Sequence, residues 1–318
     1  MMVFFHNIIN HRAGFDDSLI PSDFLSIAKT HKKVIYKRLV VIYTELNKLT
    51  PQVQREFCER VATSNNIQQI CNRTITPLKR MDIPITIRQI LTDLFLDLYT
   101  QILRGNNTFS KKYGTIRLHF EKFRELNSAI TICPLCGISE LKTEFDDSPE
   151  QYDHFFPKTL YPVSSVNFEN LVPTCKDCNG FDCKSDKDTF ELGTEKIFYP
   201  YSKEEQEVDI DFLIAKEPEM KDWIWTVNIS GRGINLTEEI TSWDKIYNIK
   251  SRYIGHIKGR IGKWINFYNE YKRKALVKGH TEAQINESFL LYVETEEEFG
   301  LNYLRKPAFD AYFNSLTL

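Results

Sequence analysis

The sequence has 318 residues, which is long enough for two or three domains with hydrophobic cores of ordinary size. Hydrophobic residues make up 42% and charged residues 26%, which excludes a disordered chain, and the net charge of −2 excludes a protein that coats nucleic acid with its whole surface. No apolar run is long enough to span a membrane and residues 1–12 do not resemble a signal peptide, so we expect a cytoplasmic protein.

Residues 1–128 are predicted to form a mostly helical region. Between Val34 and Leu49, apolar residues recur every three or four positions, which predicts an amphipathic helix that ends before Pro51. Residues 85–103 are apolar on most sides, which predicts a buried helix. This whole region is typical of a structural core.

The pattern changes near Ala129. Short β-like segments at 129–133 and 170–175 lie among loops rich in Pro, Asn and Asp, so we expect a small α+β unit over residues 129–200. Its last residues, 197–201, read as an extended linker. Residues 201–318 are predicted to be mostly helical, with one strand at 223–229.

Four of the seven cysteines form two Cys-x-x-Cys pairs, Cys133 with Cys136 and Cys175 with Cys178. Two such pairs place four thiolates around one ion at about 2.3 Å, the arrangement of a structural zinc site. A redox role needs only one pair. Cys183 is an ordinary buried thiol or an alternative ligand of the same site.

Between the two cysteine pairs lies the sequence Asp153-His154-Phe-Phe-Pro-Lys158, followed by Asn170-Leu-Val-Pro, and Asn179 directly follows the last cysteine. Taken alone, a histidine between an acid and aromatic residues is more often a packed side chain than a catalyst. The order of all these motifs over about 60 residues is more specific.

In that order, the stretch resembles the HNH endonuclease family, whose ββα-metal finger binds one divalent cation and cuts phosphodiester bonds. The resemblance implies that His154 is the general base, that Asp153 and Asn179 are metal ligands, and that Asn170 braces the loop that positions the histidine. Asn179 stands where many members carry a histidine. A carboxylate and an amide oxygen favour Mg²⁺ or Mn²⁺ over softer metals.

The chemistry of the residues supports these roles. A neutral imidazole can take a proton from water at cytoplasmic pH. Side chains of adjacent strand residues point to opposite faces, so Asp153 and His154 can share a site only at a bend or a strand end. Lys158 and Lys184 are predicted nucleic-acid contacts, although a solvated helix-start lysine is an equally good interpretation of Lys184.

Residues 244–278 carry ten Lys or Arg and two acids, and their apolar positions step by three and four, which predicts one basic helix. Three glycines, at 255, 259 and 262, share the face opposite the apolar stripe. Arg252, Lys258 and Lys263 flank them, which favours contact with a phosphate backbone or a partner helix; a solvated basic face is the alternative. The acidic segment 282–298 is a candidate neighbour of this helix, and such packing would weaken the nucleic-acid interpretation.

Together these features predict an α+β protein in which an HNH ββα-metal core with structural zinc is held between helical regions, and which cuts DNA or RNA. The motifs and long helical flanks are similar to the HNH component of Septu-type anti-phage systems, including retron-associated ones. That resemblance implies an ABC-type ATPase partner that docks on the terminal helices. A zinc-stabilised binding module without catalysis, and a nuclease of restriction or mobile-element type that acts alone, stay open as alternatives.

Overall fold

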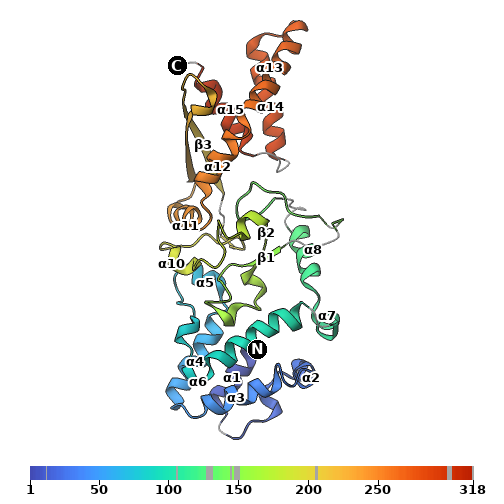
Figure 1. The fold of residues 1–318 in the computed structure, drawn as a ribbon, viewed down its shortest axis with the longest axis vertical. Helices are drawn as coiled ribbons and strands as arrows, with labels where there is room; N and C mark the ends of the chain where they lie inside the picture. Colours follow the sequence, from blue (N-terminus) through green and yellow to red (C-terminus); the bar gives the residue numbers. More distant parts are fainter. Residues whose placement is uncertain are drawn as a thin grey trace.

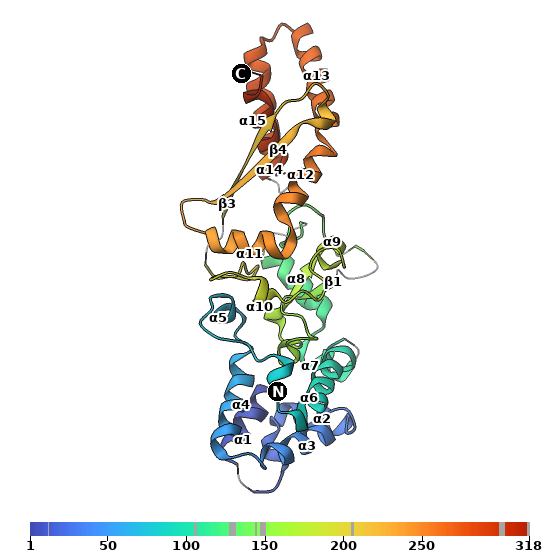
Figure 2. The same cartoon turned by 60° about the vertical axis from the view of Figure 1, so that its left-hand side comes forward.

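The computed structural model describes residues 1–11, 13–104, 107–126, 132–143, 145–146, 151–204, 207–298 and 303–316. The molecule is elongated and has three tiers (Figure 1). N-terminal helices form one end, a pair of short strands lies near the middle, and C-terminal helices form the opposite end, where the chain also ends (Figures 1 and 2). The α+β class expected from the sequence is confirmed.

The N-terminal tier is built from helices, as predicted. They are α1 (Met2–Asn10), α2 (Ser22–Thr30), α3 (Tyr36–Leu46), α4 (Pro51–Thr63), α5 (Ile67–Cys71), α6 (Ile85–Asp97), α7 (Asn107–Tyr113) and α8 (Ile116–Leu126). Helix α3 confirms the predicted amphipathic helix and buries Leu39, Ile42 and Leu46. It packs on α6 in the core of this tier.

Helix α6 continues into a π-helical turn at Leu98–Leu103, so the predicted helix over 85–103 is present. The expectation that it is buried on most sides is wrong. Ile85 is 75% exposed and Leu96 is 39% exposed, because α6 packs through one face only. The π turn brings Tyr99 and Leu103 into contact with the middle tier.

The middle tier holds β1 (Gln151–His154), β2 (Leu171–Thr174), α9 (Lys176–Asn179) and α10 (Thr189–Leu192). The two strands pair antiparallel, with Asp153 opposite Val172 and His154 opposite Leu171. Strand β2 confirms the β-like segment at 170–175. Of the other predicted β-like segment, 129–131 lies outside the described residues, and Ile132 forms an isolated bridge with Glu140.

The C-terminal tier combines a two-stranded sheet with helices. Its elements are β3 (Val208–Ala215), β4 (Ile224–Gly231), α11 (Thr237–Tyr247), α12 (Ile249–Lys258), α13 (Ile261–Val277), α14 (Glu282–Glu298) and α15 (Arg305–Asn314). Strand β4 confirms the predicted strand. Its antiparallel partner β3 was not predicted. Figure 2 shows the two strands as a long hairpin beside the C-terminal helices.

The single basic helix predicted over 244–278 is wrong, because the chain breaks twice. Asn248 takes a left-handed conformation, with φ of 54°, and ends α11, and a second break at 259–260 separates α12 from α13. The apolar stripe nevertheless stays buried at Ile249, Tyr253 and Ile257. Breaks that keep the three-and-four spacing turn the axis without changing which side chains face the core.

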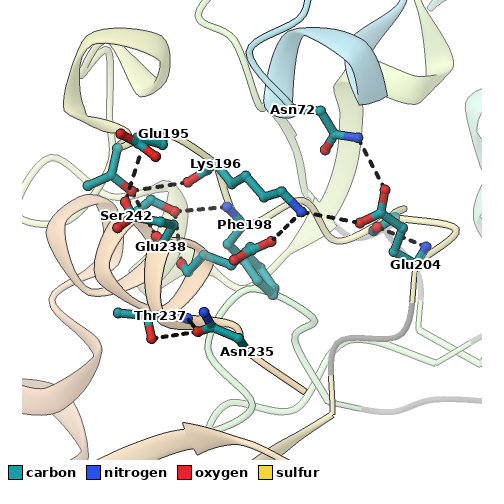
Figure 3. A network of polar contacts seen from close by, with 12 residues as sticks. Asn72, Glu195, Lys196, Phe198, Glu204, Asn235, Thr237, Glu238 and Ser242 are labelled. Atoms are coloured by element: carbon teal, nitrogen blue, oxygen red, sulfur yellow. Dashed lines mark hydrogen bonds and ion pairs between the residues drawn. The ribbon is translucent and has the colours of Figure 1, made fainter.

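The segment 194–204, which joins the middle tier to the C-terminal tier, is held by polar contacts (Figure 3). The Phe198 amide donates to Ser242 Oγ at 2.8 Å, and Thr194 Oγ1 donates to the Glu238 carbonyl at 2.9 Å. Lys196 Nζ lies 3.7 Å from a Glu204 carboxylate oxygen, and Asn72 Nδ2 donates to that carboxylate at 3.2 Å. These bonds fix α11 on the linker and the linker on the end of α5.

The buried apolar residues of the described chain form two large cores and one small cluster. One core lies mainly within the N-terminal tier, and the other runs from α5 and α8 through the middle tier into the C-terminal tier. The middle tier therefore shares its core with the C-terminal helices. Among the described helices, none combines the length and the apolar character needed to cross a membrane.

Candidate metal centre and catalytic cleft

The four cysteines of the two Cys-x-x-Cys pairs meet in the middle tier. All are buried, and their Sγ atoms lie within 4.8 Å of one another. Cys133 Sγ is 3.9 Å from Cys178 Sγ, and Cys136 Sγ is 3.9 Å from Cys175 Sγ. Tetrahedral zinc with 2.3 Å bonds requires sulfur–sulfur separations of about 3.8 Å. The cluster therefore fits a metal ion such as zinc.

Local backbone geometry explains why each pair turns both thiols inward. In the first pair, the Gly137 amide donates to the Cys133 carbonyl at 2.8 Å, and Gly137 has a φ of +64°. A Cβ at that glycine would lie 2.6 Å from the Tyr303 hydroxyl, so both the turn and the packing require glycine. In the second pair, Cys175 caps α9 and its Sγ accepts from the Cys178 amide at 3.5 Å.

The C-terminal tier supplies further donors to this cluster. Arg252 Nη1 donates to Cys178 Sγ at 3.2 Å and lies 3.8 Å from Cys183 Sγ. Arg252 was predicted to contact nucleic acid, and here the structure differs: its guanidinium is half-buried against thiols. Cys183 donates to the Tyr247 carbonyl at 3.5 Å and lies outside the four-cysteine group.

The carbonyl groups of the first cysteine pair are also capped from the C-terminal tier. Trp243 Nε1 donates to the Leu135 carbonyl at 2.6 Å. The hydroxyls of Tyr253 and Tyr303 both donate to the Cys136 carbonyl at 3.1 Å. These contacts seal the cluster from solvent and tie three C-terminal helices or loops to it.

Asp153 and His154 lie at the end of β1, as the sequence required for them to share a site. Both line a cleft of about 810 Å³ between the middle tier and the end of the N-terminal tier. Lys158 and Asn179 line the same cleft on the side of the middle tier. The structure thus brings the predicted general base and both predicted metal ligands to one cavity.

The environment of His154 fixes its tautomer and charge. Its Nε2 lies 3.0 Å from the Ser165 carbonyl, so the proton sits on Nε2 and the Nδ1 lone pair is available. Burial, together with the charge of Lys158, lowers the pKa of His154 to about 3. The ring of Tyr99 packs edge-on against the imidazole at 4.5 Å. The low pKa keeps the imidazole neutral but also makes it a weak proton acceptor, and the bond to Ser165 partly offsets this weakness because it favours the charged ring.

Asn170 is fully buried and holds the loop that follows His154. Its Oδ1 accepts from the Phe156 amide at 2.7 Å, and its Nδ2 donates to the Phe156 and Ser164 carbonyls, both at 3.1 Å. Ser165, which follows Ser164 in the chain, accepts the hydrogen bond of His154 Nε2 through its carbonyl. Asn170 therefore connects the residues on either side of this loop, and one of its partners, Ser164, is adjacent to the residue that contacts the imidazole.

Lys184 differs from its predicted place. It is fully buried, whereas a phosphate contact or a solvated helix start requires an exposed ammonium group. Its Nζ donates to Asp153 Oδ1 at 3.0 Å and to the His154 carbonyl at 2.7 Å. Its backbone amide donates to the Cys178 carbonyl at 3.3 Å. Lys184 thereby links the cysteine cluster to the cleft.

Asp153 and Asn179 are the residues that the sequence predicts as ligands of a divalent cation, and both line the cleft. Burial raises the pKa of Asp153, and Lys184 opposes this shift. Asp153 Oδ2 lies 2.9 Å from Lys184 Nζ but makes no hydrogen bond of its own within the described chain. Asn179 donates through Nδ2 to Gln151 at 3.1 Å, which leaves its amide oxygen as a ligand atom. These hard oxygens fit Mg²⁺ or Mn²⁺, with Lys184 as a competing cation.

The remaining predicted nucleic-acid contacts lie in two places. Lys158 is in the cleft, whereas Lys258 and Lys263 are exposed near the break between α12 and α13 and do not line the cleft. A Cβ at Gly255 would meet nothing within 4 Å, so no helix among the described residues packs on that glycine. Helix α14 packs on α13, as expected for the acidic segment, through the Lys272–Glu282 ion pair at 2.9 Å.

Arg104 was not predicted from the sequence as a site residue, although it lines the cleft from the N-terminal tier together with Tyr99. No motif marks it, since it lies 50 residues before His154 and enters the site only because the π turn ends there. Arg252 was noticed for its charge, but its contact with Cys178 spans 74 positions and has no local signal.

Comparison with known proteins gives one partial match. The chain is 33% identical over 76 residues to Septu protein PtuB from Bacillus thuringiensis. The aligned part covers 24% of this chain and 26% of that protein, so the two are alike over about a quarter of each. No family model matches the chain, and no solved structure matches it.

Proposed function

We propose that this protein is a metal-dependent nuclease of HNH type that hydrolyses phosphodiester bonds in DNA or RNA. The observation that carries the proposal is the meeting of His154, Asp153 and Asn179 in one polar cleft. His154 is neutral and oriented by Ser165, and the two other residues offer hard oxygen ligands. The cysteine cluster next to them, which fits zinc, holds the strand and helix that carry these groups.

His154 accepts a proton from water at Nδ1 while its Nε2–H stays bonded to the Ser165 carbonyl. That bond stabilises the imidazolium that forms, because a charged donor strengthens it. A divalent cation held by Asp153 and Asn179 would stabilise the charge on the phosphoryl oxygens and on the leaving 3′ oxygen. Asn170 keeps the Ser164–Ser165 segment in place, so the imidazole stays aimed at the cleft.

We further propose that the nuclease is the effector of a bacterial anti-phage system and works with an ABC-type ATPase. The partial similarity to a Septu protein supports this role. The helical tiers at the two ends of the elongated molecule are the surfaces on which such a partner would dock (Figure 1). Copurification with the product of a neighbouring ATPase gene tests the partnership directly.

The nuclease proposal is tested by nicking of supercoiled plasmid, and of RNA, with added Mg²⁺ or Mn²⁺. We expect the His154→Ala variant to lose cleavage by about 10²–10⁴-fold while keeping its fold and zinc content. Asp153→Ala and Asn179→Ala should raise the Mn²⁺ concentration needed for half-maximal cleavage. Cleavage by His154→Ala at the wild-type rate refutes the assigned base.

Two other functions are separated by the same assay. A zinc-stabilised binding module would bind nucleic acid without cutting it under any metal condition. A restriction or mobile-element nuclease would cut as the purified chain alone, with no effect of an ATPase partner. We favour the role in an anti-phage system over these two functions because of the partial match to the Septu protein.

A further inference from the structure

Two cations of the cleft lie close to the imidazole of His154 without a carboxylate partner. Arg104 Cζ is 5.9 Å and Lys158 Nζ is 5.3 Å from the centre of the Tyr99 ring. That ring is 4.5 Å from the His154 ring. Among the described residues, neither cation forms an ion pair, whereas the nearby Lys184 is bonded to Asp153. Arg104 and Lys158 therefore hold the free positive charge beside the proposed base.

The two cations come from different tiers of the molecule. Arg104 follows the π turn of the N-terminal tier, and Lys158 belongs to the loop after β1 in the middle tier. The ring of Tyr99, also from the N-terminal tier, lies near both cations and packs against His154. A cleft that receives one cation from each tier suits a group with two negatively charged oxygens.

A phosphodiester is such a group, since each of its two non-bridging oxygens accepts charge-assisted hydrogen bonds. Arginine donates to phosphate through a planar fork and lysine donates as a point charge, and both are usual phosphate ligands. Both cations line the cleft that holds His154, so a phosphate bound there would have one cation from each tier available to it. Neither interaction depends on the base or the sugar, so the contact is independent of nucleotide sequence.

We infer that Arg104 and Lys158 form a clamp that grips the scissile phosphodiester of a nucleic-acid strand between the N-terminal and middle tiers. The inference rests on the proposed nuclease function. It assigns strand binding to the cleft rather than to the basic surface at Lys258 and Lys263. It also makes the N-terminal tier a part of the substrate site, because the isolated middle tier lacks the wall that carries Arg104.

The test measures binding of a fluorescein-labelled DNA oligonucleotide, single-stranded and duplex, by fluorescence anisotropy at several salt concentrations. The full chain carries His154→Ala to prevent cleavage. Arg104→Ser with Lys158→Ser should weaken binding at least tenfold. It should also lower the log–log salt slope by about 1.4 on the single strand and about 1.8 on the duplex. The form that shows the larger loss identifies the preferred substrate.

Lys32→Ser with Lys33→Ser removes the same charge from an exposed segment between α2 and α3 and should leave binding unchanged. Arg104→Lys should retain most of the affinity, which distinguishes a charge effect from lost packing on Tyr99. Equal melting temperatures for all variants exclude unfolding as the cause. In the His154-intact background, the clamp variant should cut more slowly even at saturating oligonucleotide.

Three outcomes separate the claims. Selective loss of binding in the clamp variant supports the inference. If the wild-type chain cuts nucleic acid and the clamp variant binds it undiminished, the clamp is overturned and the nuclease function stands. If the Lys258→Ser, Lys263→Ser variant loses binding instead, the binding surface lies at the α12–α13 break. A wild-type chain that neither binds nor cuts any nucleic acid refutes the nuclease function, and the clamp with it.

Discussion

The cysteine cluster and the cleft are built from the same stretch of chain, yet their polar atoms are satisfied in opposite ways. Around the cluster, backbone amides and Arg252 donate to sulfur, and C-terminal hydroxyl groups cap the carbonyl of Cys136. In the cleft, Asp153 Oδ2 has an ion pair with Lys184 but no well-aligned hydrogen bond, and Arg104 and Lys158 have no carboxylate partner within the described chain. A closed shell suits a structural ion, whereas unsatisfied groups are available to a substrate and a second cation.

The difference predicts which substitutions act on the fold and which act on chemistry. Changes in the cluster should remove metal and structure together. Changes in the cleft should remove binding or cleavage and spare the metal content. Changes at Lys184 and Asn170 should affect both the fold and the cleft, because each residue connects the cysteine-bearing strand and helix to the cleft.

The largest effect is expected from Cys175→Ser. Removing one of four thiolates weakens a site whose metal binding is coupled to folding, so the middle tier should unfold and the chain should lose its zinc. Elemental analysis and thermal melting measure both changes. Cys183→Ser is the matched control, since Cys183 lies near Cys178 but outside the group of four. Loss of zinc from the control variant would mean that Cys183 is a ligand.

Lys184→Met should cost about 3–5 kcal/mol of the free energy of unfolding, because it leaves the carboxylate of Asp153 buried without a counter-charge. Urea denaturation measures the change. Adding Asp153→Asn should recover most of the loss, since the second substitution removes the uncompensated charge. Lys176→Met, at an exposed position, should shift stability by less than about 0.5 kcal/mol. A double variant no more stable than Lys184→Met alone would exclude the ion pair as the cause.

Asn170→Ala should cost about 2–3 kcal/mol, since it leaves a buried amide and two buried carbonyls without partners. The displaced Ser164–Ser165 segment should also lower the cleavage rate at saturating substrate. Zinc content should stay at the wild-type value, because Asn170 does not contact the cysteines. Wild-type stability in this variant would show that water replaces the three bonds.

Arg252→Met should have the smallest effect, a release of zinc to a chelator about tenfold faster than from the wild type. The reason is the loss of the donor to Cys178 Sγ, which stabilises the thiolate. Lys250→Met, on the same helix and exposed, should release zinc at the wild-type rate. If both variants behave alike, the arginine serves packing alone.

The site could be predicted from the sequence wherever its signal is local. The Cys-x-x-Cys pairs bring their own thiols together through short turns, and Asp153 and His154 are neighbours at a strand end. Lys184 could be seen as a cation, but its burial depends on a partner 31 residues away. Arg104 enters the cleft only through the packing of two tiers, which leaves no trace in the sequence around it.

The fold follows the same division. Amphipathic helices such as α3 and the alternating strand β4 were found because side chains on one face share one environment. Strand β3 was missed although its apolar residues Val208, Ile210 and Phe212 alternate with Asp209 and Asp211, because the two acids continue the polar character of the preceding segment. The breaks at Asn248 and Gly259 were missed because they preserve the phase of the apolar stripe.

Arg252 contacts the second cysteine pair and Tyr303 contacts the first, and both residues appear much later in the chain, which sets an order of events during synthesis. Arg252 lies 74 residues after Cys178, and Tyr303 lies 167 residues after Cys136. At ordinary translation rates, about 4–15 s pass between the appearance of Cys178 and that of Arg252. The nascent chain therefore presents all four thiols before its own outer donors exist. A metal ion captured by the four thiols in that interval would be held more loosely than in the finished protein, because the donors from the C-terminal tier would still be missing.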